Sequence, residues 1–190
     1  MKSLNNWLLV LSVLSCFGCS SPVHEDDRGC AFVSDSIQYR VEFMSAGCVR
    51  ILSFPEGDTL VTRRLVVDSE KPAFKDYKWE DTGQKLLFRT RELSVVFDKA
   101  DVAFTFQETS TGKLLLKEKG DRKARNFKRS VAGGEQCLEV TQRFVPTEDE
   151  AIYGLGQYQN GIMNYRGKSV LLLQANMDIV NPFLISTNGY

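Results

Sequence analysis

The sequence has few of the residue types that hold metal ions or act as nucleophiles. Its 190 residues include one histidine and five cysteines. The histidine, His24, lies in a short polar stretch, and no cysteine spacing resembles a zinc site. Metal binding and cysteine-based catalysis are therefore poor interpretations of this chain, and we expect it to use no cofactor.

An excess of one charge is also missing. The chain carries 24 basic and 24 acidic side chains, which gives a formal net charge of zero. Basic residues gather between Lys113 and Arg129, but Phe127 is the only aromatic residue among them. Surfaces that bind single-stranded nucleic acid combine basic with aromatic side chains. We therefore interpret this stretch as the solvated end of a hairpin and not as an anionic-ligand patch, and we expect no nucleic-acid partner.

An apolar run of membrane-spanning length is absent, but a shorter run lies near the N-terminus. It extends from Trp7 to Leu14, well below the roughly 18 residues of a helical span. We interpret residues 1–18 as a secretory signal. Cys16 follows a small serine and two aliphatic residues, as the lipid-modified cysteine of bacterial lipoproteins does, and Cys19 is the alternative. An ordinary cleaved signal would leave the chain unanchored, whereas lipidation would anchor it without spanning the membrane.

The residues that follow suit a tether and one domain. Residues 19–29 are polar and short, and about 160 residues remain in 30–190, enough for one domain with a sizeable core. That domain contains Cys30, Cys48 and Cys137, and an odd number leaves at least one thiol unpaired in an oxidising compartment. The sequence does not fix their pairing. We expect an exported protein, a periplasmic or cell-surface lipoprotein of a Gram-negative-type bacterium.

The domain shows the pattern of short β-strands. Apolar and polar residues alternate from Ile37 to Phe43, as in a strand that is buried on one face. No segment carries a capped helical stripe, so we predict an all-β fold, an antiparallel β-sandwich. Further strands are predicted at residues 48–54, 59–67, 85–90, 93–97, 102–107, 113–117, 138–144 and 170–174.

The last residues predict a strand without a partner. An apolar segment begins at Phe183 and leads to Asn188-Gly189, which is a strong hairpin signal. No returning strand follows, and proteins usually avoid an unpaired apolar edge. We therefore expect the sandwich to be truncated at its C-terminal edge, and a frayed terminus is the alternative.

Two short motifs suggest chemistry that their context does not favour. Glu148-Asp149-Glu150 offers the carboxylates of glycoside hydrolysis, but neighbours in a polar turn point into water, where no burial raises a pKa. Gly154-Leu155-Gly156 lacks the third glycine and the following helix of a phosphate-binding loop. We assign no catalytic residue to either motif.

The residues from Tyr153 to Tyr190, which include Tyr153-Gly154-Leu155-Gly156-Gln157 and Asn164-Tyr165-Arg166-Gly167, carry the most specific part of a resemblance to a known family. The chain resembles the N-terminal domain of glycoside hydrolase family 31, which contains α-glucosidases and α-xylosidases. The resemblance covers roughly residues 30–190, and Gln157 with Asn-x-Arg-Gly is most similar to bacterial α-xylosidases, whereas many α-glucosidases carry glutamate at this position. The most specific matching motifs are Ile152-Tyr153-Gly154-Leu155-Gly156-Gln157, Asn160-Gly161, Asn164-Tyr165-Arg166-Gly167, Leu173-Gln174-Ala175-Asn176, Pro182-Phe183 and Ser186-Thr187-Asn188-Gly189-Tyr190.

The resemblance implies a galactose-mutarotase-like β-sandwich that packs on a (β/α)8 barrel. That barrel would carry the two catalytic aspartates of a retaining mechanism, so these residues alone should hydrolyse nothing. The full-length enzyme would remove terminal α-linked xylose, or glucose, from an oligosaccharide or polysaccharide. The alternative is a stand-alone carbohydrate-binding or adhesion lipoprotein, which should close its sheet within its own chain.

In this family a loop of the N-terminal domain reaches the barrel mouth and helps to bound the substrate pocket. The resemblance places that loop between Arg166 and Pro182 and implies Arg166, Gln174, Asn176 and Asp178 as substrate-binding residues. A simpler interpretation is that these polar side chains bond to their own backbone.

Glycines and tyrosines precede that loop. Gly154 and Gly156 would let the chain turn sharply beside the neighbouring domain, because they lack a Cβ. Tyr153, Tyr158 and Tyr165 are able to stack on a sugar ring, and packing in a core or between domains is the alternative.

Overall fold

The computed structural model describes residues 22–58, 73–120 and 125–190. The predicted signal, the lipidation candidates Cys16 and Cys19, and the strand predicted at residues 59–67 lie outside these ranges. Every regular element within them is a β-strand, which confirms the all-β prediction. No helix in the described ranges has the length and apolarity needed to cross a membrane.

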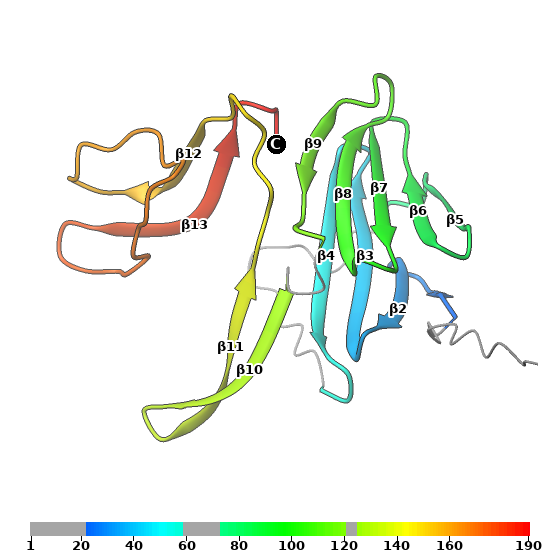
Figure 1. Cartoon of the computed structure of the whole chain (residues 1–190), viewed down its shortest axis with the longest axis horizontal. Helices are drawn as coiled ribbons and strands as arrows, with labels where there is room; N and C mark the ends of the chain where they lie inside the picture. Colours follow the sequence, from blue (N-terminus) through cyan, green and yellow to red (C-terminus); the bar gives the residue numbers. More distant parts are fainter. Residues whose placement is uncertain (1–21, 59–72, 121–124) are drawn as a thin grey trace, which may run out of the picture.

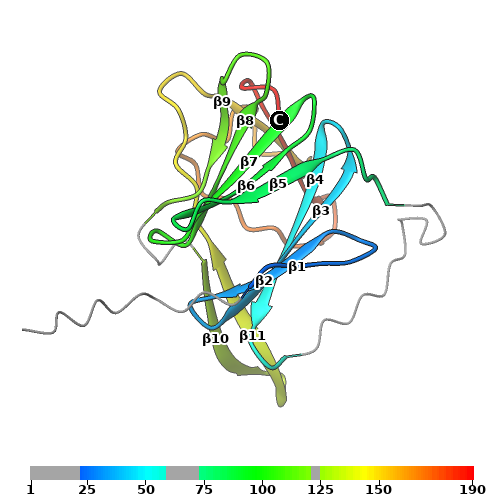
Figure 2. The same cartoon turned by 90° about the vertical axis from the view of Figure 1, so that its right-hand side faces the viewer.

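Two antiparallel sheets face each other, as Figures 1 and 2 show. The strands follow one another in chain order within each sheet, because short turns join them as hairpins. The first sheet contains β1 (His24–Glu25), β2 (Cys30–Ser34), β3 (Ile37–Ser45) and β4 (Cys48–Pro55). The second contains β5 (Lys78–Asp81), β6 (Lys85–Arg89), β7 (Leu93–Asp98), β8 (Ala103–Glu108) and β9 (Leu114–Lys117).

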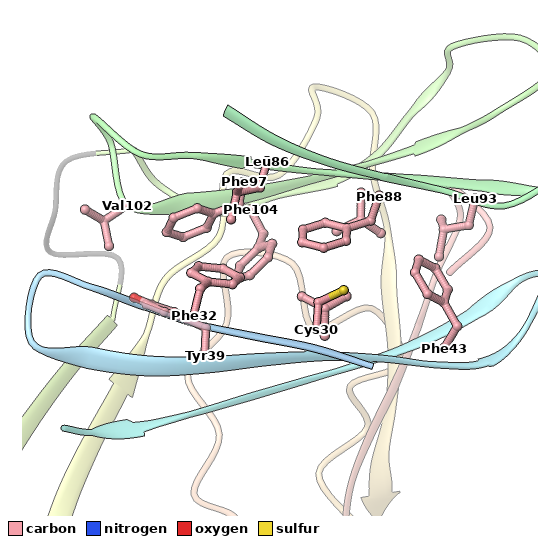
Figure 3. Packing of buried hydrophobic residues seen from close by; sticks show 12 residues of the cluster. Cys30, Phe32, Tyr39, Phe43, Leu86, Phe88, Leu93, Phe97, Val102 and Phe104 are labelled. Carbon is pink, nitrogen blue, oxygen red and sulfur yellow. The ribbon is translucent and has the colours of Figure 1, made fainter. Parts of the chain in front are cut away.

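Aromatic side chains fill the space between the sheets (Figure 3). The ring of Phe97, in β7, lies 4.8 Å from that of Phe32 and 5.1 Å from that of Tyr39, both of the opposite sheet. Burying one such side chain stabilises the fold by about 1.5 to 3 kcal/mol. The alternation predicted for β3 is confirmed, since Tyr39, Val41 and Phe43 are buried.

β1 links the two sheets at one edge. It pairs with β2, while the Glu25 carboxylate accepts hydrogen bonds from Tyr77 Oη at 2.8 Å and from Trp79 Nε1 at 2.9 Å. Trp79 lies in β5 of the other sheet. The bonds from Trp79 and Tyr77 lower the pKa of Glu25. Part of the segment interpreted as a tether is therefore a strand at the edge of the domain.

The basic stretch contains a buried ion pair and is not simply a solvated hairpin end. The guanidinium of Arg125 donates to Glu118 Oε1, and their side chains are 7% and 3% exposed. The same guanidinium lies 5.2 Å from the ring centre of Tyr39. Glu118 also accepts from the backbone N–H of Phe104 and from Gln142, although burial raises its pKa. The other basic side chains of the stretch within the described ranges are exposed, so the prediction is wrong for Arg125 alone. Charge density along a sequence does not show which side chain turns inward.

Two further two-stranded ribbons lie outside the sandwich (Figure 1). One is β10 (Arg125–Ala132) with β11 (Glu135–Gln142), and the other is β12 (Ile152–Gln157) with β13 (Ile179–Ser186). The strand predicted at residues 170–174 is wrong, because this apolar run is irregular and largely exposed. The strand expected from Phe183 is part of β13, and the chain turns after it, so that Ser186 N donates to Tyr190 O.

Candidate functional site

The glycines of the Ile152–Gln157 motif lie inside a strand. β12 carries three successive residues with positive φ, Gly154, Leu155 and Gly156, and its pairing with β13 shifts at this point. A Cβ on Gly156 would lie 2.0 Å from the carbonyl oxygen of Ile179, and one on Gly154 would lie 2.6 Å from that of Phe183. These glycines therefore permit a β-bulge and close strand contact, and the sharp loop predicted for them is replaced by a ribbon.

Arg166 lies within the connection from β12 to β13, residues 158–178, and is the first residue of the predicted loop. Its Nη1 donates to the carbonyl oxygens of Thr147 at 2.5 Å and Glu150 at 2.9 Å. Its backbone N–H donates to Asn164 Oδ1 at 3.0 Å. The guanidinium group thus fastens the loop to the turn before β12.

Gln174 closes the other end of the same loop. Its Nε2 donates to the carbonyl oxygen of Asp178 at 3.0 Å, and its Oε1 accepts from the N–H of Val180 at 3.1 Å. Both bonds are made to the backbone, as the simpler interpretation of these polar residues expects. They hold a tight turn in which Met177 adopts a φ of 73°.

Asn176 and Asp178 lie in that turn. Asn176 is exposed and Asp178 is half-buried. In the described part of the chain neither side chain forms a hydrogen bond to protein. The four predicted residues thus share one loop, in which two side chains hold its shape and two present polar groups to solvent.

Glu150 is buried next to the start of this loop, so the prediction that all three acids of Glu148-Asp149-Glu150 point into water is wrong for this residue. It is 3% exposed, whereas Glu148 and Asp149 of the same turn point into water as predicted. Its carboxylate accepts from Ser186 Oγ at 2.6 Å, from Tyr190 Oη and from Thr147 N at 2.9 Å.

The hydrogen bonds to the Glu150 carboxylate determine its ionisation state. Burial opposes ionisation of Glu150, but the hydrogen bonds from Ser186 and Tyr190 outweigh burial and lower its pKa. Burial and the Glu150 carboxylate in turn raise the pKa of Tyr190 to about 12. An ionised acceptor therefore faces a phenol that keeps its proton, so the interaction persists at neutral pH.

The tyrosines have mixed surroundings. Tyr165 is buried, and its N–H donates to the carbonyl oxygen of Ile152, which favours a packing role. Tyr158 donates to the carbonyl oxygen of Leu155 at 3.0 Å. Tyr153 is half-buried on β12.

Large apolar side chains are exposed along the β12–β13 ribbon and its loop. Leu171 is 78% exposed and Phe183 is 60% exposed. Folded single domains rarely expose a large apolar area without a partner. We call this set the apolar surface, and it consists of Met163, Leu171, Leu172, Leu173, Met177, Ile179, Phe183, Leu184 and Ile185.

Among residues 22–58, 73–120 and 125–190, no group of histidine, cysteine or acidic side chains is placed to hold a metal ion. Cys30, Cys48 and Cys137 are free thiols, and burial raises the pKa of Cys30 to about 11. Two hollows, of about 520 Å³ and about 290 Å³, lie beside the β10–β11 ribbon, so neither adjoins the candidate loop.

Comparison with known sequences places most of the chain in one family. Residues 38–188 match the glycosyl hydrolase 31 N-terminal galactose mutarotase-like domain. An alpha-xylosidase of Saccharolobus solfataricus is 31% identical over 170 residues, which cover 82% of this chain and 22% of the relative. An uncharacterized family 31 glucosidase of Pseudescherichia vulneris is 38% identical over 66 residues, 35% of this chain and 12% of the relative. The chain thus spans less than a quarter of these relatives.

Solved structures show the same fold. The GH31 alpha-xylosidase of Xanthomonas citri has a TM-score of 0.73 at 28% identity, over 87% of this chain and 18% of that one. A GH31 alpha-xylosidase from a soil metagenome, complexed with xylose, has a TM-score of 0.70 at 22% identity, over 89% of this chain and 27% of that one. The match to the second structure supports the fold alone.

Proposed function

Because the chain belongs to the family of glycosyl hydrolase 31 N-terminal galactose mutarotase-like domains, we propose that it is the non-catalytic N-terminal part of an exported α-glycosidase. The full-length enzyme removes a terminal α-linked sugar, xylose in preference to glucose, from an oligosaccharide or polysaccharide by a retaining mechanism. Its catalytic aspartates belong to a (β/α)8 barrel outside these 190 residues.

The apolar surface is the structural observation that supports this proposal best. Leu171 and Phe183 lie on the ribbon and loop that carry the predicted sugar-binding residues. An apolar face buried against a neighbouring domain removes this area from water and stabilises the assembly. The barrel would therefore cover the apolar surface, and the loop would then lie beside the substrate pocket of the barrel.

The preference for xylose is supported by the sequence motifs and by relatives. Gln157 and Asn164-Tyr165-Arg166-Gly167 are the residues most similar to α-xylosidases. The curated relative from Saccharolobus solfataricus and the solved enzyme from Xanthomonas citri are both named alpha-xylosidases.

The decisive experiment compares two proteins on two substrates. The product of the whole gene should hydrolyse an aryl α-xyloside with a higher kcat/KM than the matching α-glucoside, whereas residues 22–190 alone should hydrolyse neither. A stand-alone binding or adhesion protein would instead bind a glycan without hydrolysing it in either form. Hydrolysis of the α-glucoside alone would leave the family role intact and overturn the preference for xylose.

Export and anchoring form a separate part of the proposal. The short apolar run before Cys16 supports a lipoprotein signal, with Cys19 as the alternative lipidated residue. A Cys16→Ser variant should lose incorporation of a labelled fatty acid and leave the membrane fraction. Loss of labelling in Cys19→Ser, and not in Cys16→Ser, would show that Cys19 is the lipidated residue. No labelling of the wild type would exclude a lipid anchor at either cysteine.

A further inference from the structure

Three chain segments meet at the turn that contains Glu150. Its Oε2 accepts from Thr147 N, which fixes the turn before β12, and its Oε1 accepts from Ser186 Oγ and Tyr190 Oη, which fixes the end of β13. Glu150 thus links its turn to Ser186 and Tyr190, which lie 36 and 40 residues further along the chain. A carboxylate suits this position because it offers only acceptors to three donors.

The third segment reaches the same turn through Arg166. Its Nη1 bonds to the carbonyl oxygens of Thr147 and Glu150, the two residues whose positions the Glu150 side chain fixes. The Glu150 carboxylate therefore helps to hold the two acceptors of the guanidinium in one place. The loop that follows Arg166 begins at this anchor.

The loop has a second anchor at its far end. Gln174 bonds to the backbone at Asp178 and Val180, so the turn that contains Asn176 is held by a side chain as well as by β13. The side chains of Asn176 and Asp178, which form no bond to protein in the described ranges, lie between Gln174 and the ribbon.

We propose that Glu150 and Arg166 are positioning residues for sugar recognition, which hold the loop of residues 166–178 so that Asn176 and Asp178 meet the substrate. This inference rests on the proposed function, and it assigns Arg166 a role different from direct sugar binding. The loop lies in the non-catalytic domain and contacts the sugar equally before and during bond cleavage. Its loss therefore weakens substrate binding and leaves the chemical step unchanged.

The first test is a pair of matched substitutions in one turn. Glu150→Gln keeps the shape of the side chain but presents an N–H to a donor, whereas Glu148→Gln makes the same change in an exposed residue. In the product of the whole gene we expect Glu150→Gln to raise KM about tenfold at nearly unchanged kcat, as the loss of one charge-assisted hydrogen bond predicts. Glu148→Gln should leave both constants unchanged.

The second test separates positioning from direct contact. Arg166→Met should raise KM by a similar factor, and the double variant Glu150→Gln with Arg166→Met should raise it little further, because both changes release the same loop. A lowered Tm with an unchanged KM in Glu150→Gln would show a purely structural role and overturn the proposal. A rise in KM in Arg166→Met with no rise in Glu150→Gln would also overturn it, because Arg166 would then contact the sugar itself.

A milder variant and a direct measurement of the loop complete the design. Should Glu150→Gln fail to fold, Tyr190→Phe removes one donor and should raise KM about threefold, as a weaker hydrogen bond predicts. An unchanged KM in folded Tyr190→Phe would then count against the proposal.

Amide hydrogen exchange measures the loop directly. The exchange of residues 166–178 should be faster in Glu150→Gln than in the wild type and unchanged in Glu148→Gln, and equal exchange in both variants would overturn the positioning role. A wild-type enzyme without glycosidase activity would overturn the proposed function instead, whatever the exchange shows.

Discussion

At the scale of single residues, Gly156 illustrates how a strand interior can require glycine. Its φ is +120°, and the nearest atom to an added Cβ would be a backbone oxygen, which cannot rotate away as a side chain does. Strain and overlap therefore combine at this position.

We expect Gly156→Ala to lower the free energy of unfolding of the β12–β13 ribbon by about 3 kcal/mol. Gly161→Ala is the matched control, because Gly161 also has a positive φ of +69° but has nothing within 4 Å of its missing Cβ. That control should cost about 1 kcal/mol, the strain alone. Amide exchange within β12 and β13 measures the difference, and equal effects of both substitutions would show that the close contact is unimportant.

Arg125 and Arg129 form a second contrast within one strand. Both pair with an acid, but the side chain of Arg125 is 7% exposed and that of Arg129 is 70% exposed. Arg125→Met should destabilise the domain by about 3 to 5 kcal/mol, because it leaves the Glu118 carboxylate buried and unpaired. Arg129→Met should change stability by less than about 1 kcal/mol. Urea unfolding of the two variants decides, and a small loss in Arg125→Met would mean that Glu118 becomes protonated at little cost.

At the scale of elements, the turn before β12 joins β13 through the charge of Glu150. The lowered pKa of Glu150 means that the folded state favours the carboxylate, so the stabilisation is present above the ordinary value of 4.5. It is lost as the pH falls from about 4.5 through the lowered pKa. Protonation turns one acceptor into a donor and so disrupts the bonds to Ser186 and Tyr190.

The expected result is a pH-dependent difference in Tm. Wild type should exceed Glu150→Gln most at pH 7, and the two melting curves should approach each other below about pH 4.5. Glu148→Gln should follow the wild type at every pH. Thermal unfolding measured by circular dichroism checks this, and a constant difference across the range would show that the Glu150 charge is not involved.

Four of the predicted strands have one face buried against the opposite sheet. β3, β6, β7 and β8 alternate in pattern because the opposite sheet removes every second side chain from water. β10 was missed because most of its residues are exposed on both faces. The apolar run at residues 170–174 was wrongly predicted to be a strand because its composition is that of a buried strand, whereas its side chains lie on the surface and cover no core.

The family resemblance placed Arg166, Gln174, Asn176 and Asp178 in one loop, and they share one connection between strands in the structure. Their role in sugar binding stays a prediction. The sequence could not show that Arg166 and Gln174 bond to backbone atoms, because the type of a polar residue does not determine which group it bonds to. Glu150 was wrongly predicted to point into water because its partners Ser186 and Tyr190 are distant in sequence, and only folding brings them together.

At the scale of the whole molecule, the sandwich and the outer ribbons differ in how they bury apolar area. The aromatic core lies between two sheets, whereas the apolar surface of the β12–β13 ribbon faces solvent in this chain. A chain with such a surface gains stability by pairing it with another apolar face. Isolated residues 22–190 should therefore associate with themselves at high concentration.

Leu171→Lys together with Phe183→Lys should shift isolated residues 22–190 towards monomer, since each substitution places a charge where association would bury it. Met44→Lys is the control, because Met44 is exposed on the sandwich and lies outside the apolar surface. Sedimentation velocity over a range of concentrations measures the shift. An equal effect of Met44→Lys would mean that net charge, and not this surface, governs association.

The edge strand β1 also decides how the molecule bears mechanical load. A pull on the chain from the N-terminal side of β1 acts first on the short β1–β2 ladder and on the bonds from Tyr77 and Trp79 to Glu25. Because those bonds connect β1 to both sheets, the force is shared between the sheets, and strand separation does not begin in one sheet alone. The loop of residues 166–178 belongs to a separate ribbon and would keep its geometry under tension at the other end of the chain.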